Sequence, residues 1–225
     1  GAVHGILLKR GGLTVDVDRD YRLTVYEDPQ KPIWQSRNAF NPFMNVRNAE
    51  SDTTSEPVKI ALGDAAEGHT KEFDDGLHQG SRIRLSGFPN TDVEVELVYA
   101  LAEEDELLIQ VEQVGGKDAV ERIGGISDWE LKSAADAYMV VPRGSGYMIR
   151  SDSPQAVTLE GFVGAQYSMP LFGLIRGPNT CYQIIESWWD ASVVVKHTPG
   201  SSTTMSLGWE PSHSKLAYPR RVLLR

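Results

Sequence analysis

The residues best suited to chemistry lie together in the segment Glu186-Ser187-Trp188-Trp189-Asp190, where two carboxylates flank adjacent tryptophans. A tryptophan ring can stack on the apolar face of a pyranose, while nearby carboxylates accept hydrogen bonds from its hydroxyls. Glu186, Trp188, Trp189 and Asp190 are therefore candidate carbohydrate contacts. The alternative is structural, with one tryptophan in the core and the other covering a sheet edge. The structural alternative carries more weight from these residues alone.

Other familiar site patterns are incomplete. The stretch from Asp16 to Glu27 mimics the acidic spacing of a calcium-binding loop, but Tyr21 occupies the position that needs glycine and no helical pattern flanks it. A solvated strand face is the favoured interpretation. The segment Gly144-Ser145-Gly146 lacks the lysine of a phosphate-binding loop and the setting of a nucleophilic serine. The five histidines are scattered, so we expect no catalytic residue, metal or cofactor site in this chain.

Composition limits the partners. The chain has 225 residues with 31 acidic and 22 basic side chains, a net charge of −9. This acidic balance argues against nucleic acid and anionic membranes as partners, and no apolar run approaches the roughly 20 residues of a membrane span. No signal peptide is recognisable at the start. The single cysteine, Cys181, allows no internal disulfide and is expected to be a buried thiol.

Apolar and polar residues alternate with period two in nearly every apolar run, as in Leu13-Thr14-Val15-Asp16-Val17. Glycine and proline separate the runs, and residues 157–195 form a series of short strands. The pattern predicts an all-β fold of two packed antiparallel sheets with minor helix, in one domain spanning residues 1–225. The one helix candidate is 127–138, capped by Ser127 or Asp128.

Two local predictions follow from this pattern. The polar loop 36–57 should pack onto a sheet through Phe40, Phe43 and Met44. If the strand 181–187 continues its alternation, Trp188 and Trp189 point to opposite faces. One of the two rings should then lie in the core and the other on a surface.

Three stretches, in order, resemble a known group of proteins. The central one combines Met169-Pro170-Leu171-Phe172-Gly173 with the Gly177 turn, Tyr182–Glu186 and Asp190-Ala191. It is similar to a segment of glycoside hydrolases of the endo-α-N-acetylgalactosaminidase group and related families. Residues 141–146 and 23–36 resemble two further segments of that group. Ser187-Trp188-Trp189 departs from its usual glycine before the aspartate, and Arg143 departs from an acidic or neutral residue, so Arg143 joins the candidate carbohydrate contacts.

The resemblance implies a galactose-mutarotase-like β-supersandwich that precedes a (β/α)₈ catalytic barrel. In such enzymes the catalytic carboxylates belong to the barrel, and the strand–helix repeat of a barrel of about 250 residues is absent here. The chain is then a non-catalytic N-terminal domain whose partner is the C-terminal barrel of the same polypeptide, with carbohydrate as a further partner. The same resemblance favours an extracellular or periplasmic location.

Two alternatives remain. The chain could be a free-standing carbohydrate-binding module, which requires only the aromatic and carboxylate contacts. It could also be an enzyme like aldose 1-epimerase, with Glu186 or Glu160 as general base. That reaction needs a histidine as its partner acid, and no histidine has a suitable neighbour in the sequence.

Overall fold

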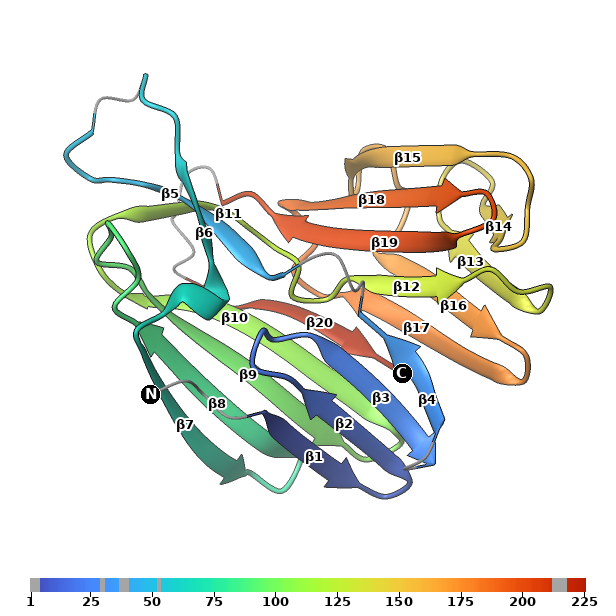
Figure 1. The fold of residues 1–225 in the computed structure, drawn as a ribbon, viewed down its shortest axis with the longest axis horizontal. Helices are drawn as coiled ribbons and strands as arrows, with labels where there is room; N and C mark the ends of the chain where they lie inside the picture. Colours follow the sequence, from blue (N-terminus) through green and yellow to red (C-terminus); the bar gives the residue numbers. More distant parts are fainter. Residues whose placement is uncertain (1–4, 29–30, 37–40, 52–53, 212–217) are drawn as a thin grey trace.

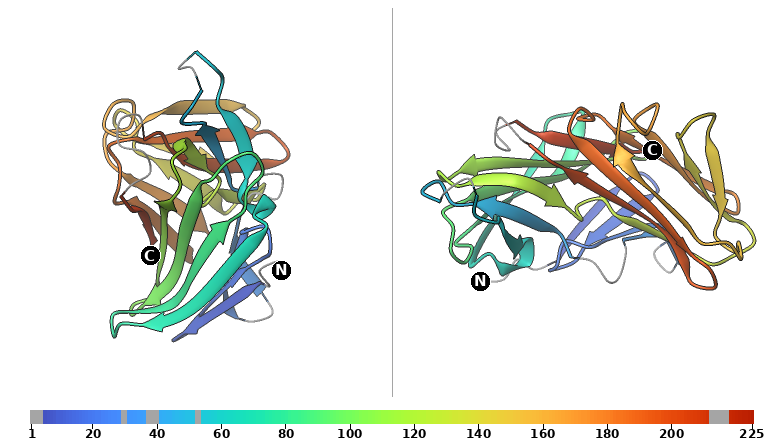
Figure 2. Two further views of the ribbon diagram at one scale, coloured as in Figure 1. Left: turned by 90° about the vertical axis from the view of Figure 1, so that its left-hand side faces the viewer. Right: turned by 90° about the horizontal axis from the view of Figure 1, so that it is seen from above.

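The computed structural model describes residues 5–28, 31–36, 41–51, 54–211 and 218–225. Two antiparallel β-sheets of 11 and 9 strands face each other, as Figures 1 and 2 show. The prediction of an all-β, two-sheet antiparallel fold is confirmed.

The larger sheet follows the order β1-β2-β3-β4-β12-β19-β11-β5-β6, and β18 joins β15 to the other side of β19. Its strands are β1 (Ile6–Arg10), β2 (Leu13–Val17), β3 (Leu23–Asp28), β4 (Lys31–Gln35), β5 (Phe43–Arg47), β6 (Val58–Ala61), β11 (Ala119–Gly124), β12 (Trp129–Lys132), β15 (Val157–Phe162), β18 (Ala191–Thr198) and β19 (Ser202–Trp209).

The smaller sheet follows the order β14-β13-β16-β17-β20-β10-β9-β8-β7. Its strands are β7 (Glu67–Asp74), β8 (His78–Ser86), β9 (Glu94–Ala102), β10 (Glu106–Gly115), β13 (Ala137–Val141), β14 (Tyr147–Arg150), β16 (Leu171–Arg176), β17 (Asn179–Ile185) and β20 (Arg220–Leu224). A single 3₁₀ turn, Leu62–Asp64, is the only helical element in the described ranges.

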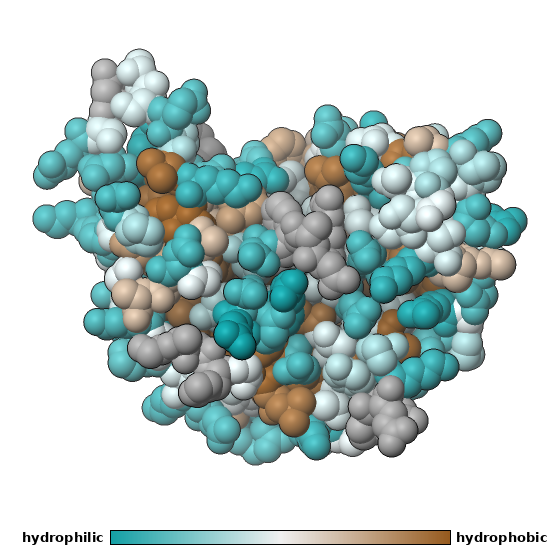
Figure 3. Space-filling view, in the orientation of Figure 1, coloured by the Kyte–Doolittle hydropathy of each residue, from teal (hydrophilic) through white to brown (hydrophobic). Residues whose placement is uncertain are grey.

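The core lies between the sheets because alternate residues of each strand point inward. Val15, Val95, Ile109 and Val193 are fully buried, and each such side chain stabilises the fold by about 1.5–3 kcal/mol relative to exposure. The view of the molecule in Figure 3, in which β1–β4 lie in front of β8–β10, is mostly hydrophilic with separate apolar patches. Cys181 is buried as predicted, and burial raises the pKa of its thiol to about 12.

The helix predicted over 127–138 is wrong. Residues 129–132 form β12, in which buried Trp129 and Leu131 alternate with a half-buried and an exposed residue. The carboxylate of Asp128 does not cap a helix but accepts a hydrogen bond from the Leu207 amide of β19 at 2.8 Å. Period-two burial against the core therefore outweighs the helix propensity of the following Ala-rich residues.

The polar segment 36–57 contains a strand as well as loop. Phe43 and Met44 are buried, as expected, but they belong to β5, which pairs with β6 and β11. Phe40 lies outside the described residues. The hairpin of β7 and β8 likewise falls in a polar stretch, where one face of an edge strand needs few apolar residues.

Candidate functional site

The turn 186–190 carries the chain from β17 in the smaller sheet to β18 in the larger one. Its backbone is held by Ser187, whose hydroxyl accepts from the Arg221 amide at 3.0 Å and donates to the Pro219 carbonyl at 3.3 Å. The Ala191 amide donates to the Trp188 carbonyl at 3.1 Å and closes the turn. The start of β20, the strand that follows β19 in the chain, therefore lies beside this turn.

A buried ion pair joins this turn to the start of β20. Arg220, whose side chain is 0% exposed, places Nη2 at 2.8 Å from Asp190 Oδ2 and Nε at 3.1 Å from Oδ1. Its Nη1 donates to the Tyr218 carbonyl at 2.8 Å. Asp190 is thus engaged on both oxygens, and its role in this structure is to fix the turn.

Both tryptophans of the turn are exposed, Trp188 at 45% and Trp189 at 56%. The prediction that one of them enters the core is wrong, because β17 ends at Ile185 and the alternation stops before the pair. The core tryptophan beside this turn is Trp209, whose Nε1 donates to the Ser187 carbonyl at 2.7 Å.

Each exposed ring has a specific support. Trp188 lies over Gly164, where a Cβ atom would come within 2.7 Å of the ring. Gly164 also has φ of +83°, a conformation that favours glycine. The Arg220 guanidinium lies 5.5 Å from the Trp189 ring centre and 5.3 Å from that of Tyr218, which is 51% exposed. We call Trp188, Trp189 and Tyr218 the aromatic platform.

The other two candidate contacts lie in different surroundings. Glu186 pairs with Arg221 Nε at 3.4 Å, and both side chains are partly exposed. Arg143 bonds to the Glu160 carbonyl of β15 at 3.4 Å, rather than to a platform residue. Four of the five predicted contacts therefore belong to one turn, and Arg143 belongs to a neighbouring loop.

Sequence reasoning missed Tyr218, Arg220 and Gly164. Asp190 and Arg220 are 30 residues apart, and only strand pairing brings them together. The sequence Tyr218-Pro219-Arg220-Arg221 leads into a terminal strand, which offered no sign that one arginine is fully buried.

The described histidines, His69, His78 and His197, do not join the candidate base Glu186, and His4 and His213 lie outside the described residues. His197 is buried in β18, with its ring nitrogens 2.8 Å from Thr203 Oγ1 and from the Ser153 carbonyl. His69 and His78 lie near Glu67 and Asp75, on the β7–β8 hairpin. Both structural settings account for these rings without a role at the turn.

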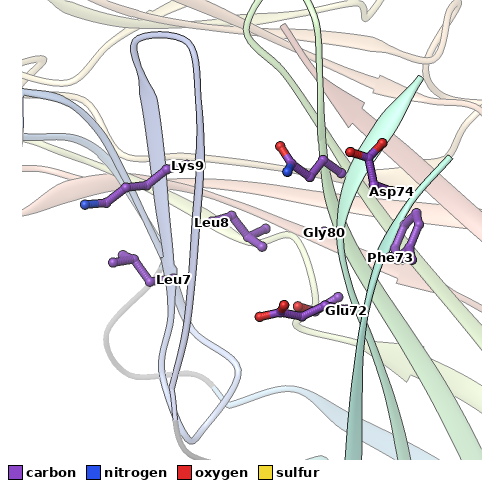
Figure 4. Close-up of a pocket in the computed structure, with 9 residues that line it drawn as sticks. Leu7, Leu8, Lys9, Glu72, Phe73, Asp74 and Gly80 are labelled. Carbon is purple, nitrogen blue, oxygen red and sulfur yellow. The ribbon is translucent and has the colours of Figure 1, made fainter. Parts of the chain in front are cut away.

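Several hollows lie away from the turn. A groove of about 400 Å³ separates β1 from the β7–β8 edge and is lined by Leu7, Lys9, Glu72 and Phe73 among others (Figure 4). A cavity of about 260 Å³ opens between the sheets beside Trp34 and Cys181.

The acidic stretch Asp16–Glu27 spans the end of β2, most of β3 and the turn between them. Asp18 Oδ1 accepts from the amides of Asp20 and Arg22 at 2.8 and 3.0 Å, so its carboxylate shapes the turn. Within the described ranges, no group of three or more histidine, cysteine or acidic side chains is placed to hold a metal ion. No helix in that part of the chain is long and apolar enough to cross a membrane.

No protein-family model matches the sequence, and no curated protein matches it significantly in sequence. Solved structures do share the fold. The α-N-acetylgalactosaminidase NagBb from Bifidobacterium bifidum, in complex with GalNAc, superposes with a TM-score of 0.83 at 19% identity. The match covers 98% of this chain and 35% of that one. The ligand-free form of the same enzyme gives a TM-score of 0.80, again over 98% and 35%.

A more distant likeness is a TPR-domain containing protein from Parabacteroides distasonis, with a TM-score of 0.58 at 12% identity, covering 98% of this chain and 46% of that one. This chain thus spans about a third of the length of the α-N-acetylgalactosaminidase that it matches. The resemblance seen in the sequence is confirmed at the level of the fold: nearly the whole chain has the architecture of one part of a glycoside hydrolase.

Proposed function

We propose that this chain is the non-catalytic β-sandwich part of a carbohydrate-active enzyme and that it supports a catalytic domain elsewhere in the same polypeptide. The observation that carries the proposal is the fold match, which takes in 98% of this chain but only 35% of NagBb. The mutarotase-like supersandwich and the barrel partner belong to the same proposal. The reaction that the neighbour suggests for the complete polypeptide is hydrolysis of an α-linked N-acetylgalactosaminide.

The carboxylates of the turn support a non-catalytic role. Glycoside hydrolysis requires two carboxyl groups on either side of the scissile bond, one of them free to give up or accept a proton. Asp190 is held on both oxygens by the buried guanidinium of Arg220, and Glu186 is paired with Arg221. Neither arrangement leaves a carboxyl pair facing an open cleft.

The test compares the isolated chain with the complete polypeptide that its gene encodes. We expect the complete polypeptide to release the aryl group from an aryl α-N-acetylgalactosaminide, and the isolated chain to release none. Turnover by the isolated chain that is lost in Glu186→Gln or Asp190→Asn would overturn the proposal. Absence of turnover by the complete polypeptide on any aryl glycoside would also overturn it.

A second candidate function is carbohydrate binding through the aromatic platform, and the exposure of both tryptophans favours it. Exposed, fixed aromatic rings suit stacking on a sugar because little conformational entropy is lost on binding. Glu186 of this turn and Arg221 of the adjacent β20 supply an acceptor and donors for hydroxyl groups.

This second function predicts that the isolated chain shifts its tryptophan fluorescence when titrated with N-acetylgalactosamine. Trp189→Ala should weaken the response at least tenfold. Tyr147→Ala, which removes an aromatic ring that is 52% exposed on β14, is the matched control and should leave it unchanged. An identical titration for wild type and Trp189→Ala would exclude the platform as the binding surface.

A further inference from the structure

An unbroken row of apolar residues and glycine crosses the face of the smaller sheet that points away from the core. Register places seven residues side by side on seven consecutive strands, from β16 to β7: Leu171, Ile184, Leu223, Leu108, Ala100, Gly80 and Phe73. We call these residues the outer row. At the usual strand spacing of about 4.8 Å, the row is about 29 Å long.

The alternation of side chains along each strand shows that the row lies on the outer face of the sheet. Its neighbours along the chain point into the core: Ile185 beside Ile184, Val222 beside Leu223, and Ile109 beside Leu108, each 0% exposed. The two faces of the sheet are thus both apolar along this line. An antiparallel sheet in a two-layer sandwich normally carries polar residues on its outer face, whereas a sheet covered on both sides carries apolar residues on both.

Four residues of the outer row, together with Val98, already form a small hydrophobic cluster. Val98, Ala100 and Leu108 are buried in it, and Phe73 and Leu223 pack against them, apart from the main core. The other end of the row is more open. Tyr182, two residues before Ile184 and on the same face of β17, is 47% exposed.

The apolar area also widens toward β14, where Met148 is 67% exposed. Register sets Met148 opposite Val140, Val140 opposite Gly173, and Gly173 opposite Tyr182, which makes a second apolar row beside the first.

Ion pairs mark the opposite border. Arg82 pairs with Glu96 at 3.1 Å, and Arg84 pairs with Glu94, on the β8–β9 part of the same face. Burial and the nearby Glu96 charge raise the pKa of Glu112, the residue across from Glu96 on β10. The face therefore has an apolar band with a charged margin, which is the composition of a covered interface with a polar rim.

We propose that the outer row is covered by another segment of the same polypeptide. This inference rests on the proposed function, because it identifies the surface by which the sandwich supports its partner domain. The α-N-acetylgalactosaminidase and the TPR-domain containing protein both hold the fold as a minor part of a longer chain, with 35% and 46% of their lengths matched. A partner linked in one polypeptide meets this surface at high effective concentration, so an apolar band need not be shielded by a separate protein.

The test places a charge on the outer row, at Ile184, and on the second apolar row beside it, at Tyr182, in two contexts. Ile184→Lys and Tyr182→Lys are made in the isolated chain and in the complete polypeptide, with Leu77→Lys as the control. Leu77 is 74% exposed at the β7–β8 turn, outside the row. Thermal unfolding, and the solution mass of the complete polypeptide, are measured for each form.

We expect each row variant to lower the Tm of the complete polypeptide by about 4 °C or more, and to change that of the isolated chain by much less. The control should change neither. Equal shifts in both contexts would mean that the row faces solvent, and would overturn the inference. So would a complete polypeptide that is a dimer and that Ile184→Lys dissociates, since a second copy would then cover the row.

The result of this test can be distinguished from a failure of the proposed function. If the complete polypeptide hydrolyses an aryl glycoside but the variants lower the Tm equally in the isolated chain and the complete polypeptide, the proposed enzyme function stands and the outer row is not its interface. If the variants lower the Tm of the complete polypeptide alone and no aryl glycoside is hydrolysed, the outer row is covered but the polypeptide is not a glycosidase. A gene that encodes no further segment would reject the covering segment outright.

Discussion

At the scale of single residues, the Asp190–Arg220 pair is the most consequential contact at the candidate site. Removing one partner of a buried ion pair leaves an unpaired charge in the protein interior, which typically costs about 3–5 kcal/mol. We expect Asp190→Ala to lower the free energy of unfolding by that amount. Glu186→Ala, which breaks the partly exposed pair with Arg221, should cost less than about 1 kcal/mol.

Urea unfolding of the two variants checks this difference. A double-mutant cycle with Arg220→Met then separates the pair from the individual side chains. Near-equal losses for Asp190→Ala and Glu186→Ala would show that the buried pair does not fix the turn.

Buried titrating groups predict the response to alkaline pH. Desolvation raises the pKa of Tyr21 and of Tyr167 from 10.0 to about 12, and that of Cys181 from 9.0 to about 12. A group with a raised pKa stabilises the fold below its unfolded value, and this stability is lost as the pH rises toward the folded value. We therefore expect the free energy of unfolding to fall between about pH 9, where the unfolded cysteine ionises, and about pH 12.

Tyr167→Phe should make the free energy of unfolding decrease less with rising pH, because the variant has no phenol at this position to ionise in the unfolded chain. It should also lower stability near neutral pH, since the Tyr167 hydroxyl lies 2.9 Å from the Val193 carbonyl, to which it can donate. Chemical unfolding at a series of pH values measures both effects. An unchanged slope in Tyr167→Phe would assign the alkaline loss to other groups.

The residue types at the site were predictable, but their environments were not. Glu186, Trp188, Trp189 and Asp190 adjoin in sequence, so any fold keeps them near one another. Which of them is exposed depends on the residue at which β17 ends and on the burial of Arg220, 30 residues from Asp190. Both depend on pairing between distant strands, which a local pattern does not contain.

At the scale of elements, period-two alternation predicted most strands because one face of each packs on the core. It failed where a strand has little apolar character, as in β7, and over residues 127–138, where an alanine-rich segment suggested a helix in place of β12. In the described part of the chain, strand pairing decides these segments. Trp129 pairs with Met205 and Leu131 with Thr203 of β19, a partner more than 70 residues away.

The end of β17 leads to a prediction for the tryptophans. Trp188→Ala and Trp189→Ala should each cost less than about 1.5 kcal/mol, because both rings are about half exposed. Trp209→Ala should cost about 3–5 kcal/mol, since that ring is buried and its Nε1 bonds to the Ser187 carbonyl. Denaturant unfolding of the three variants, followed by circular dichroism, tests this ranking. A loss of about 3 kcal/mol from either exposed tryptophan would mean that the turn holds the fold together.

The pairing of β8 with β9 allows no side chain at Gly80. A Cβ atom there would meet the Tyr99 carbonyl oxygen at 2.1 Å and the Ala100 side chain at 2.8 Å. We expect Gly80→Ala to destabilise the fold by about 1–3 kcal/mol through this overpacking. Gly12→Ala is the matched control, because nothing lies within 4 Å of its added Cβ. Equal stability of the two variants would show that β8 and β9 are further apart than described.

At the scale of the whole molecule, a continuous core connects strands from both ends of the sandwich. The main cluster includes Val15 and Trp34 from the first four strands, and Val193 and Trp209 from the strands that follow the turn. The two ends are joined weakly in the larger sheet, where the pairing of β4 with β12 within the described residues is between Gln35 and Glu130. In the smaller sheet, β20 pairs with both β10 and β17 and connects them more firmly.

The prediction that residues 1–225 form one domain therefore depends on β20 and the shared core. If it holds, unfolding in urea should be a single transition that tryptophan fluorescence and far-UV circular dichroism report at the same midpoint. Val222→Ala, at a fully buried position of β20, should lower that midpoint for both probes together, at a cost of roughly 1–3 kcal/mol. If Val222→Ala instead splits the unfolding into two steps, the ends of the sandwich are separate folding units that β20 holds together.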